Sequence, residues 1–152
     1  MDFRKKLAFG CYLLSLILCG VFGLLYLISP QFMPYHAVAI GATWKDLAPA
    51  YRILILALMK STGAGFLGTS IAGFFVLFIP FRSGALWANW SMLLVGLIVT
   101  IPTLYATLTV KWSTPASPPW VASLIGMLLV VAGFTLSTKR AHVRVGGVKS
   151  LS

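Results

Sequence analysis

Residues 53–68 read ILILALMKSTGAGFLG, and this stretch decides the fold of the chain. It places Lys60 inside one of the longest apolar runs in the sequence. A run of about 20 apolar residues is the length that a helix needs to cross the hydrocarbon of a bilayer. The stretch therefore predicts a membrane-spanning helix, and it raises the question of what a lysine does within it.

The composition of the whole chain is that of a membrane protein. Its 152 residues are 59% hydrophobic and 9% charged, whereas soluble domains carry about 25% charged residues. The net charge of +10 would suggest nucleic acid if the chain were soluble. Here the basic residues lie almost entirely in loops and tails, as they do in membrane proteins. We therefore expect the lipid bilayer, and no nucleic acid, as the surroundings of this chain.

The sequence contains four apolar runs of membrane-spanning length. They predict an all-α fold, a four-helix transmembrane bundle that forms a single integral membrane domain over residues 1–152. The four spans are expected at about residues 7–28, 53–79, 86–110 and 120–137.

The loop at residues 29–52 is the only connection with room for structure of its own. Thr43 and Asp46 have the spacing of a capping box, in which each side chain accepts a hydrogen bond from the other residue's backbone amide. A short helix is therefore expected to begin at Thr43. We predict that the loop forms a small extracytoplasmic cap over the end of the bundle.

The distribution of basic residues predicts the orientation of the helices. If the N-terminus is cytoplasmic, the inner segments carry eight lysines and arginines and the outer segments carry three. Membrane proteins keep an excess of basic residues on the cytoplasmic side. We therefore expect both termini in the cytoplasm, with residues 138–152 as a basic cytoplasmic tail.

The second span is longer than a bilayer requires. Twenty residues counted back from Pro80 place Lys60 at the outer boundary of the hydrocarbon, where its flexible stem can carry the charge to water. Residues 53–59 would then protrude from the membrane, and the cap is expected to cover them. Two interpretations of Lys60 stay open, an interfacial anchor and a residue that contacts a ligand or an ion.

Small residues follow Lys60 at helical spacing, on one narrow stripe of the second span. Such a stripe lets the backbone of another helix approach closely, which is how many membrane helices associate. We predict a helix-packing role for it, either within the chain or in a homo-oligomer or larger membrane complex. The stripe consists of Ser61, Gly65, Gly68 and Ala72.

The polar residues expected on the outer face are His36, Asp46, Arg52 and Lys60. Their convergence under the cap would form a binding site, with Asp46 paired to Arg52 or to Lys60. An equally good interpretation of Asp46 is a capping carboxylate that is satisfied by the N-terminus of its own helix.

Residues for metal or proton chemistry are sparse. The two histidines, His36 and His142, are expected on opposite sides of the membrane, and the chain has no glutamate. Metal sites need clustered histidine, cysteine or carboxylate ligands, and proton-coupled transporters keep an ionisable residue at membrane depth. We therefore expect no metal, no cofactor and no catalytic residue.

Three classes of function remain open. The first is an interaction or accessory protein that acts through helix packing in the bilayer, as the small-residue stripe indicates. The second is a protein that binds or transports a lipid or an apolar small molecule at an outer-leaflet pocket. The third and least supported is a membrane enzyme in which His36, Asp46 and Lys60 converge under the cap.

Four segments together resemble a family of small bacterial four-helix integral membrane proteins. They are MPYHAVAIG (33–41), the residues IPFR, GALWA and W between positions 79 and 90, PTLYATL (102–108) and TPASPPW (114–120). The resemblance covers about residues 30–137 and implies a location in the bacterial inner (plasma) membrane. The family has no assigned activity, so the resemblance implies a fold and no function.

Overall fold

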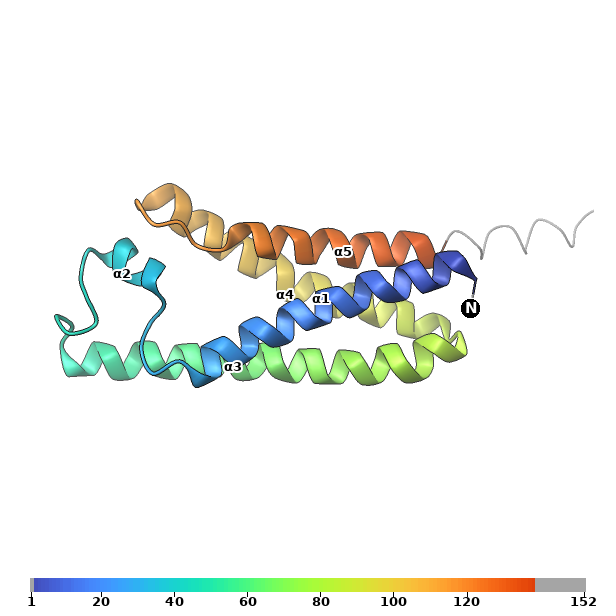
Figure 1. Ribbon diagram of the computed structural model, residues 1–152, viewed down its shortest axis with the longest axis horizontal. Helices are drawn as coiled ribbons and strands as arrows, with labels where there is room; N and C mark the ends of the chain where they lie inside the picture. The colour runs from blue at the N-terminus through green and yellow to red at the C-terminus, as the bar shows by residue number, and fades with distance from the viewer. Residues whose placement is uncertain (1, 139–152) are drawn as a thin grey trace, which may run out of the picture.

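The computed structural model describes residues 2–138 and shows an all-α four-helix bundle (Figure 1). Four long helices follow one another in antiparallel order along the chain. A short helix lies between the first two, and a π-helical turn, η1 (Leu77–Phe81), continues the second. The helices are α1 (Phe3–Ile28), α2 (Pro34–Ile40), α3 (Pro49–Val76), α4 (Leu86–Ser113) and α5 (Trp120–Thr138).

The four long helices are long and apolar enough to cross a membrane, which confirms the predicted fold class. Large apolar side chains cover the outside of the bundle. Phe75 on α3 is 64% exposed and Ile98 on α4 is 71% exposed. A surface of this kind is stable where the solvent is lipid hydrocarbon.

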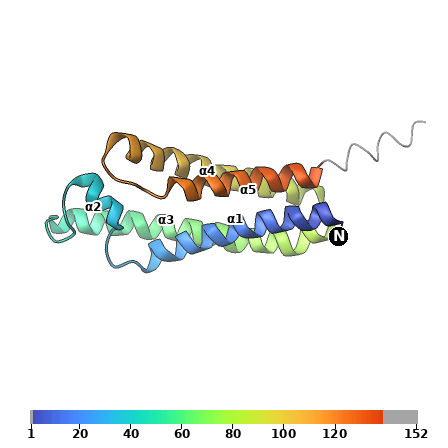
Figure 2. The same cartoon turned by 45° about the horizontal axis from the view of Figure 1, so that its top comes forward.

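The helices form two pairs, α1 with α3 and α4 with α5 (Figure 2). Helix α1 also packs along α5 and so joins the pairs, whereas α3 and α4 contact each other only sparsely. The start of α1 and the end of α5 lie at one end of the bundle, here called the N-terminal end (Figure 1). Helix α2 and residues 114–119 lie at the opposite end, here called the cap end.

Glycines bring α1 and α3 into backbone contact. A Cβ atom added to Gly63 would lie 2.8 Å from the carbonyl oxygen of Gly23, and one added to Gly23 would lie 2.6 Å from the backbone nitrogen of Leu67. Nearer the N-terminal end, the hydroxyl of Ser70 donates a hydrogen bond to the carbonyl of Leu16 at 2.8 Å. Membrane helices gain packing energy from such close approach, because lipid supplies little hydrophobic drive for helix association.

A buried polar network ties three helices together at the N-terminal end. The hydroxyl of Tyr12 on α1 donates to Oδ1 of Asn89 on α4 at 2.8 Å, and the hydroxyl of Ser137 on α5 lies 2.6 Å from the same oxygen. Tyr12 is fully buried and Asn89 is 8% exposed. Hydrogen bonds of this kind fix the rotation of each helix, because an unpaired polar group in this surrounding is costly.

The helices extend beyond the spans that the sequence predicts. Helix α3 with η1 covers Pro49–Phe81, 33 residues, which is about 50 Å of helix. Helix α4 runs to Ser113, past the expected limit at residue 110, and α5 ends at Thr138. The predicted cytoplasmic tail after that residue lies outside the described part of the chain.

The predicted helix at Thr43 is wrong, because residues 44–46 form only a turn and the helix of this loop is α2. Ala48 has extended backbone angles before Pro49, the first residue of α3. A residue before proline is disfavoured in the α region, so a helix from Thr43 has no room to continue.

Residues 53–59 are only partly covered, because Met59 is 4% exposed but most of the other side chains of the segment are not buried. Ile53 is 70% exposed and Leu58 is 60% exposed. Helix α2 is held instead against the end of α1, where the Tyr26 and Tyr35 hydroxyls share a hydrogen bond. The outer turns of α3 therefore project beyond α1 as an apolar helix (Figure 1).

Candidate functional site

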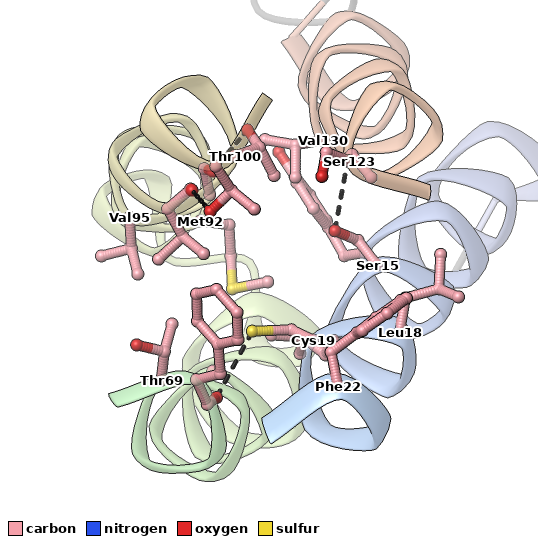
Figure 3. A pocket seen from close by; sticks show the side chains of 18 of the residues that line it. Ser15, Leu18, Cys19, Phe22, Thr69, Met92, Val95, Thr100, Ser123 and Val130 are labelled. Atoms are coloured by element: carbon pink, nitrogen blue, oxygen red, sulfur yellow. Dashed lines mark hydrogen bonds between the residues drawn. The ribbon is translucent and has the colours of Figure 1, made fainter. Parts of the chain in front are cut away.

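A cavity of about 440 Å³ lies between the four long helices (Figure 3). Along α1 its lining runs from Tyr12 to Tyr26, a length of about 21 Å. Side chains from α1, α3, α4 and α5 all contribute to it. Its volume is within the range of small-molecule sites, and the space between the helices of a bundle is a usual place for one.

The cavity exists because one of the four helix interfaces is not closed. Val130 packs on Gly96 between α4 and α5, and Tyr12 packs on Gly133 between α1 and α5. Between α3 and α4 contacts are sparse. Gly68 of α3 and Val95 of α4 both line the cavity and are both exposed, so the opening faces the outside of the bundle.

The wall of the cavity is apolar, and no charged residue is among the described residues that line it. Several of its hydroxyl groups are bonded to backbone carbonyls. Ser15 donates to Gly126 at 3.4 Å across the α1–α5 interface, and Thr100 and Thr103 donate to carbonyls one turn earlier on α4. The cavity therefore suits an uncharged, mainly apolar molecule.

Tyr26 stands at the cap end of the cavity and links it to α2. His36 of α2 packs against the rings of Tyr26, Tyr35 and Phe32, with centroids 6.5, 4.2 and 6.3 Å away. Its Nδ1 accepts a hydrogen bond from the backbone N–H of Met33 at 3.3 Å. Burial lowers the pKa of His36, because the charged imidazolium loses hydration among the rings.

Lys60 caps the C-terminus of α1. Its ammonium group donates hydrogen bonds to the carbonyl oxygens of Leu27 and of Ser29, the latter at 3.1 Å. Carbonyls at a helix C-terminus lack intrahelical partners, and a cation there is favoured by the helix dipole. Lys60 therefore lies level with the end of α1 and satisfies its backbone.

Asp46 and Arg52 stabilise the turn before α3. The carboxylate of Asp46 accepts bonds from the backbone N–H of Thr43 at 3.0 Å and from its hydroxyl at 2.6 Å. Those bonds, and to a smaller extent the charge of Arg52, lower the pKa of Asp46. The guanidinium of Arg52 donates to the carbonyls of Leu47 at 2.8 Å and Lys45 at 2.7 Å.

The four residues of the predicted outer site thus have separate partners. Within residues 2–138, no hydrogen bond or ion pair joins any two of them, and none lines the cavity. A second recess of about 350 Å³ in the cap is lined by other residues, among them Phe32 and Trp44. Convergence of His36, Asp46 and Lys60 is absent from this arrangement.

The predicted small-residue stripe lies on an exposed face of α3. Ser61, Gly65, Gly68 and Ala72 are all exposed, and a Cβ added to Gly65 or Gly68 would meet nothing within 4 Å. Packing against α1 uses Gly63 and Ser70 instead. Gly68 and Ala72 form part of the cavity lining, and association of the stripe with a second copy stays a prediction.

Apart from Gly68 and Ala72, sequence reasoning missed the residues that line the cavity, and it missed the network beside it. Asn89 was available as a signal, since it is the only asparagine in the sequence and lies within an apolar span. A polar side chain in such a span usually faces the interior of the bundle. The hydroxyls of Thr69 and Ser123 gave no signal, because serine and threonine commonly bond their own helix backbone.

Comparison with known proteins supplies no relative. No family model matches this chain, and no curated protein or solved structure matches it significantly. The candidate function is therefore derived from the site itself.

Proposed function

We propose that this protein binds an apolar molecule of the bilayer in the cavity between its four helices. The observation that carries the proposal is a cavity of about 440 Å³ that has no charged residue in its described lining and whose open side, between α3 and α4, lies on the apolar outer surface of the bundle. A molecule dissolved in the membrane can enter sideways without crossing water. Binding, or the transfer of such a molecule to a partner, is the function that this geometry supports best.

The proposed site differs in depth from the outer-leaflet pocket that the sequence suggested. It begins beside Tyr12 and ends at Tyr26, so it occupies the interior of the bundle. Lys60, at the end of α1, lies outside it. The lysine contributes to the frame of the site by fixing the end of α1 against α3.

Native mass spectrometry of the protein released from its membrane tests the proposal. The wild type is expected to retain a lipid-sized mass at a fixed stoichiometry. Gly68→Phe places a ring at the open side of the cavity and should abolish retention. Gly65→Phe is the matched control, since Gly65 is also exposed and unpacked but does not line the cavity. Equal retention in both variants would contradict the proposal.

A second candidate is the interaction or accessory role through helix packing. It is supported by the stripe on α3, which is exposed and has room for an approaching helix at Gly65 and Gly68. Crosslinking in native membranes should then detect homodimers that both phenylalanine variants abolish. If both variants lost the dimer and both still retained the lipid, the interaction role would be favoured over lipid binding in the cavity.

The location belongs to the proposal as well. We place the protein in a bacterial inner membrane with the N-terminal end of the bundle in the cytoplasm. Arg4, Lys5, Lys6 and Arg82 lie at that end, and the excess of basic residues there supports this orientation. Labelling of single cysteines introduced at Ser83 and Ser117 from outside the cell should reach only position 117.

A further inference from the structure

We infer that the molecule held in the cavity is an uncharged lipid with a hydroxyl or carbonyl oxygen that lies near the middle of the bilayer. This inference rests on the proposed function and specifies its ligand. Two side chains on opposite sides of the cavity carry it, Thr69 on α3 and Ser123 on α5 (Figure 3).

Among the described residues, three of the hydroxyls that line the cavity have no partner, those of Thr69, Ser123 and Ser91. Ser91 lies near the start of α4, toward the N-terminal end of the bundle. In contrast, the hydroxyls of Ser15, Thr100 and Thr103 around the same cavity are all bonded to carbonyls. A serine or threonine in a membrane helix normally donates to the carbonyl one turn earlier. Thr69 and Ser123 are therefore the two unpaired hydroxyls of the lining that lie away from its N-terminal end, and they are available to a ligand.

Thr69 and Ser123 lie at a similar depth. Ser70, the neighbour of Thr69, bonds the carbonyl of Leu16 on α1. Gly126, one turn from Ser123, accepts a bond from Ser15 on α1. Both hydroxyls are thus level with the middle of α1, where bilayer water is scarcest and an unpaired polar group is most costly.

The charge of the ligand follows from the same surroundings. The described lining contains no side chain that could balance a phosphate, a carboxylate or an ammonium group. An ion at this depth without a counter-charge is strongly disfavoured. A neutral oxygen, in contrast, can accept a bond from either hydroxyl and, if it is itself a hydroxyl, can also donate to that side chain.

Photolabelling in vesicles separates this inference from the proposed function. The probes are a long-chain alcohol and an alkane of equal length, each with a diazirine on the chain. The alcohol is expected to label the wild type saturably and to bind about five- to tenfold more tightly than the alkane, as one or two hydrogen bonds would give. A fatty acid of the same length should compete poorly at a pH at which it is ionised.

The matched variants remove hydroxyls with little change in shape. Thr69→Val combined with Ser123→Ala should reduce the affinity for the alcohol to that for the alkane. Thr109→Val is the control, since Thr109 is exposed, bonds the carbonyl of Tyr105 and lies outside the cavity. Circular dichroism and gel filtration would check that each variant folds.

The outcomes differ for the two claims. Absence of saturable labelling by either probe would contradict the proposed function and the inference together. Equal affinity of the wild type for the alcohol and the alkane would overturn the inference alone. This comparison uses only the wild type, so it remains decisive even if the double variant fails to fold.

Discussion

The ammonium group of Lys60 on α3 donates hydrogen bonds to the carbonyls of Leu27 and Ser29 at the end of α1. Lys60→Met keeps much of the stem and removes these bonds. We expect a loss of about 1–3 kcal/mol in the free energy of unfolding, as for hydrogen bonds to charged groups. Reversible unfolding in mixed micelles would measure it.

Asp46→Asn is the companion variant for Lys60→Met. Asp46 bonds Thr43 and has no bond to Lys60, so the effects of the two substitutions should add. If Lys60→Met were as stable as the wild type, or if the effects of the two substitutions were strongly non-additive, Lys60 would not act as the cap of α1.

Glycines on two faces of α3 should respond in opposite ways to alanine. Gly63→Ala places a Cβ 2.8 Å from the backbone of α1 and is expected to destabilise the α1–α3 pair by about 1–3 kcal/mol. Gly65→Ala meets open space and should be neutral or slightly stabilising, because alanine favours helix. Thermal unfolding would compare the stability of the two variants. Equal changes in stability would show that the rotation of α3 about its axis is not the one described here.

The Tyr12–Asn89–Ser137 network should behave as one unit. Tyr12→Phe and Asn89→Leu are each expected to cost about 1 kcal/mol, the scale of side-chain hydrogen bonds between membrane helices. The double variant should lose less than the sum, because either substitution already breaks the Tyr12 bond. Additive losses would indicate that the two side chains do not interact.

The cap should loosen in acid. The closed cap holds the pKa of His36 below its ordinary value of 6.5. The imidazole of His36 therefore binds a proton more readily when the cap is open. The stability that the neutral imidazole gives is present above pH 6.5 and falls as the pH drops through the folded pKa. Within residues 2–138 no ion pair to His36 offsets this, and its aromatic neighbours there are Tyr26, Phe32 and Tyr35.

Trp44 reports the opening of the cap, because its ring lies 5.0 Å from that of Phe32. In a variant with Trp44 as the single tryptophan, its fluorescence should change between pH 7 and the folded pKa of His36. His36→Phe should remove the change. A transition that persists in His36→Phe would have to be assigned to another group.

The sequence predicted the fold well because four apolar runs leave few alternatives for a chain in lipid. The rotation of each helix was harder. Helix α3 has small residues on two faces, and the stripe through Gly65 and Gly68 was the more regular one. The face that packs on α1 includes Gly63, which lies two residues or about 200° away from Gly65. Gly20 and Gly23 of α1 were the clue to the correct face.

The cavity could not be predicted, because it depends on an interface that fails to close. The separation of α3 and α4 depends on how each packs on its own partner, α3 on α1 at Gly63 and α4 on α5 at Gly96, and no local sequence pattern records such geometry. The outer residues were predicted as a group because all are polar and near one loop. Each instead satisfies the backbone nearest to it, as Lys60 does for Leu27.

Crosslinking from two positions on α4 tests the central claim most directly. A photoreactive benzoylphenylalanine at Val95 faces the opening of the cavity, whereas one at Ile98, which is 71% exposed, faces bulk lipid. In native membranes we predict one discrete uncharged lipid adduct at position 95, and a mixture that follows the membrane composition at position 98. The same mixture at both positions would contradict a specific occupant of the cavity.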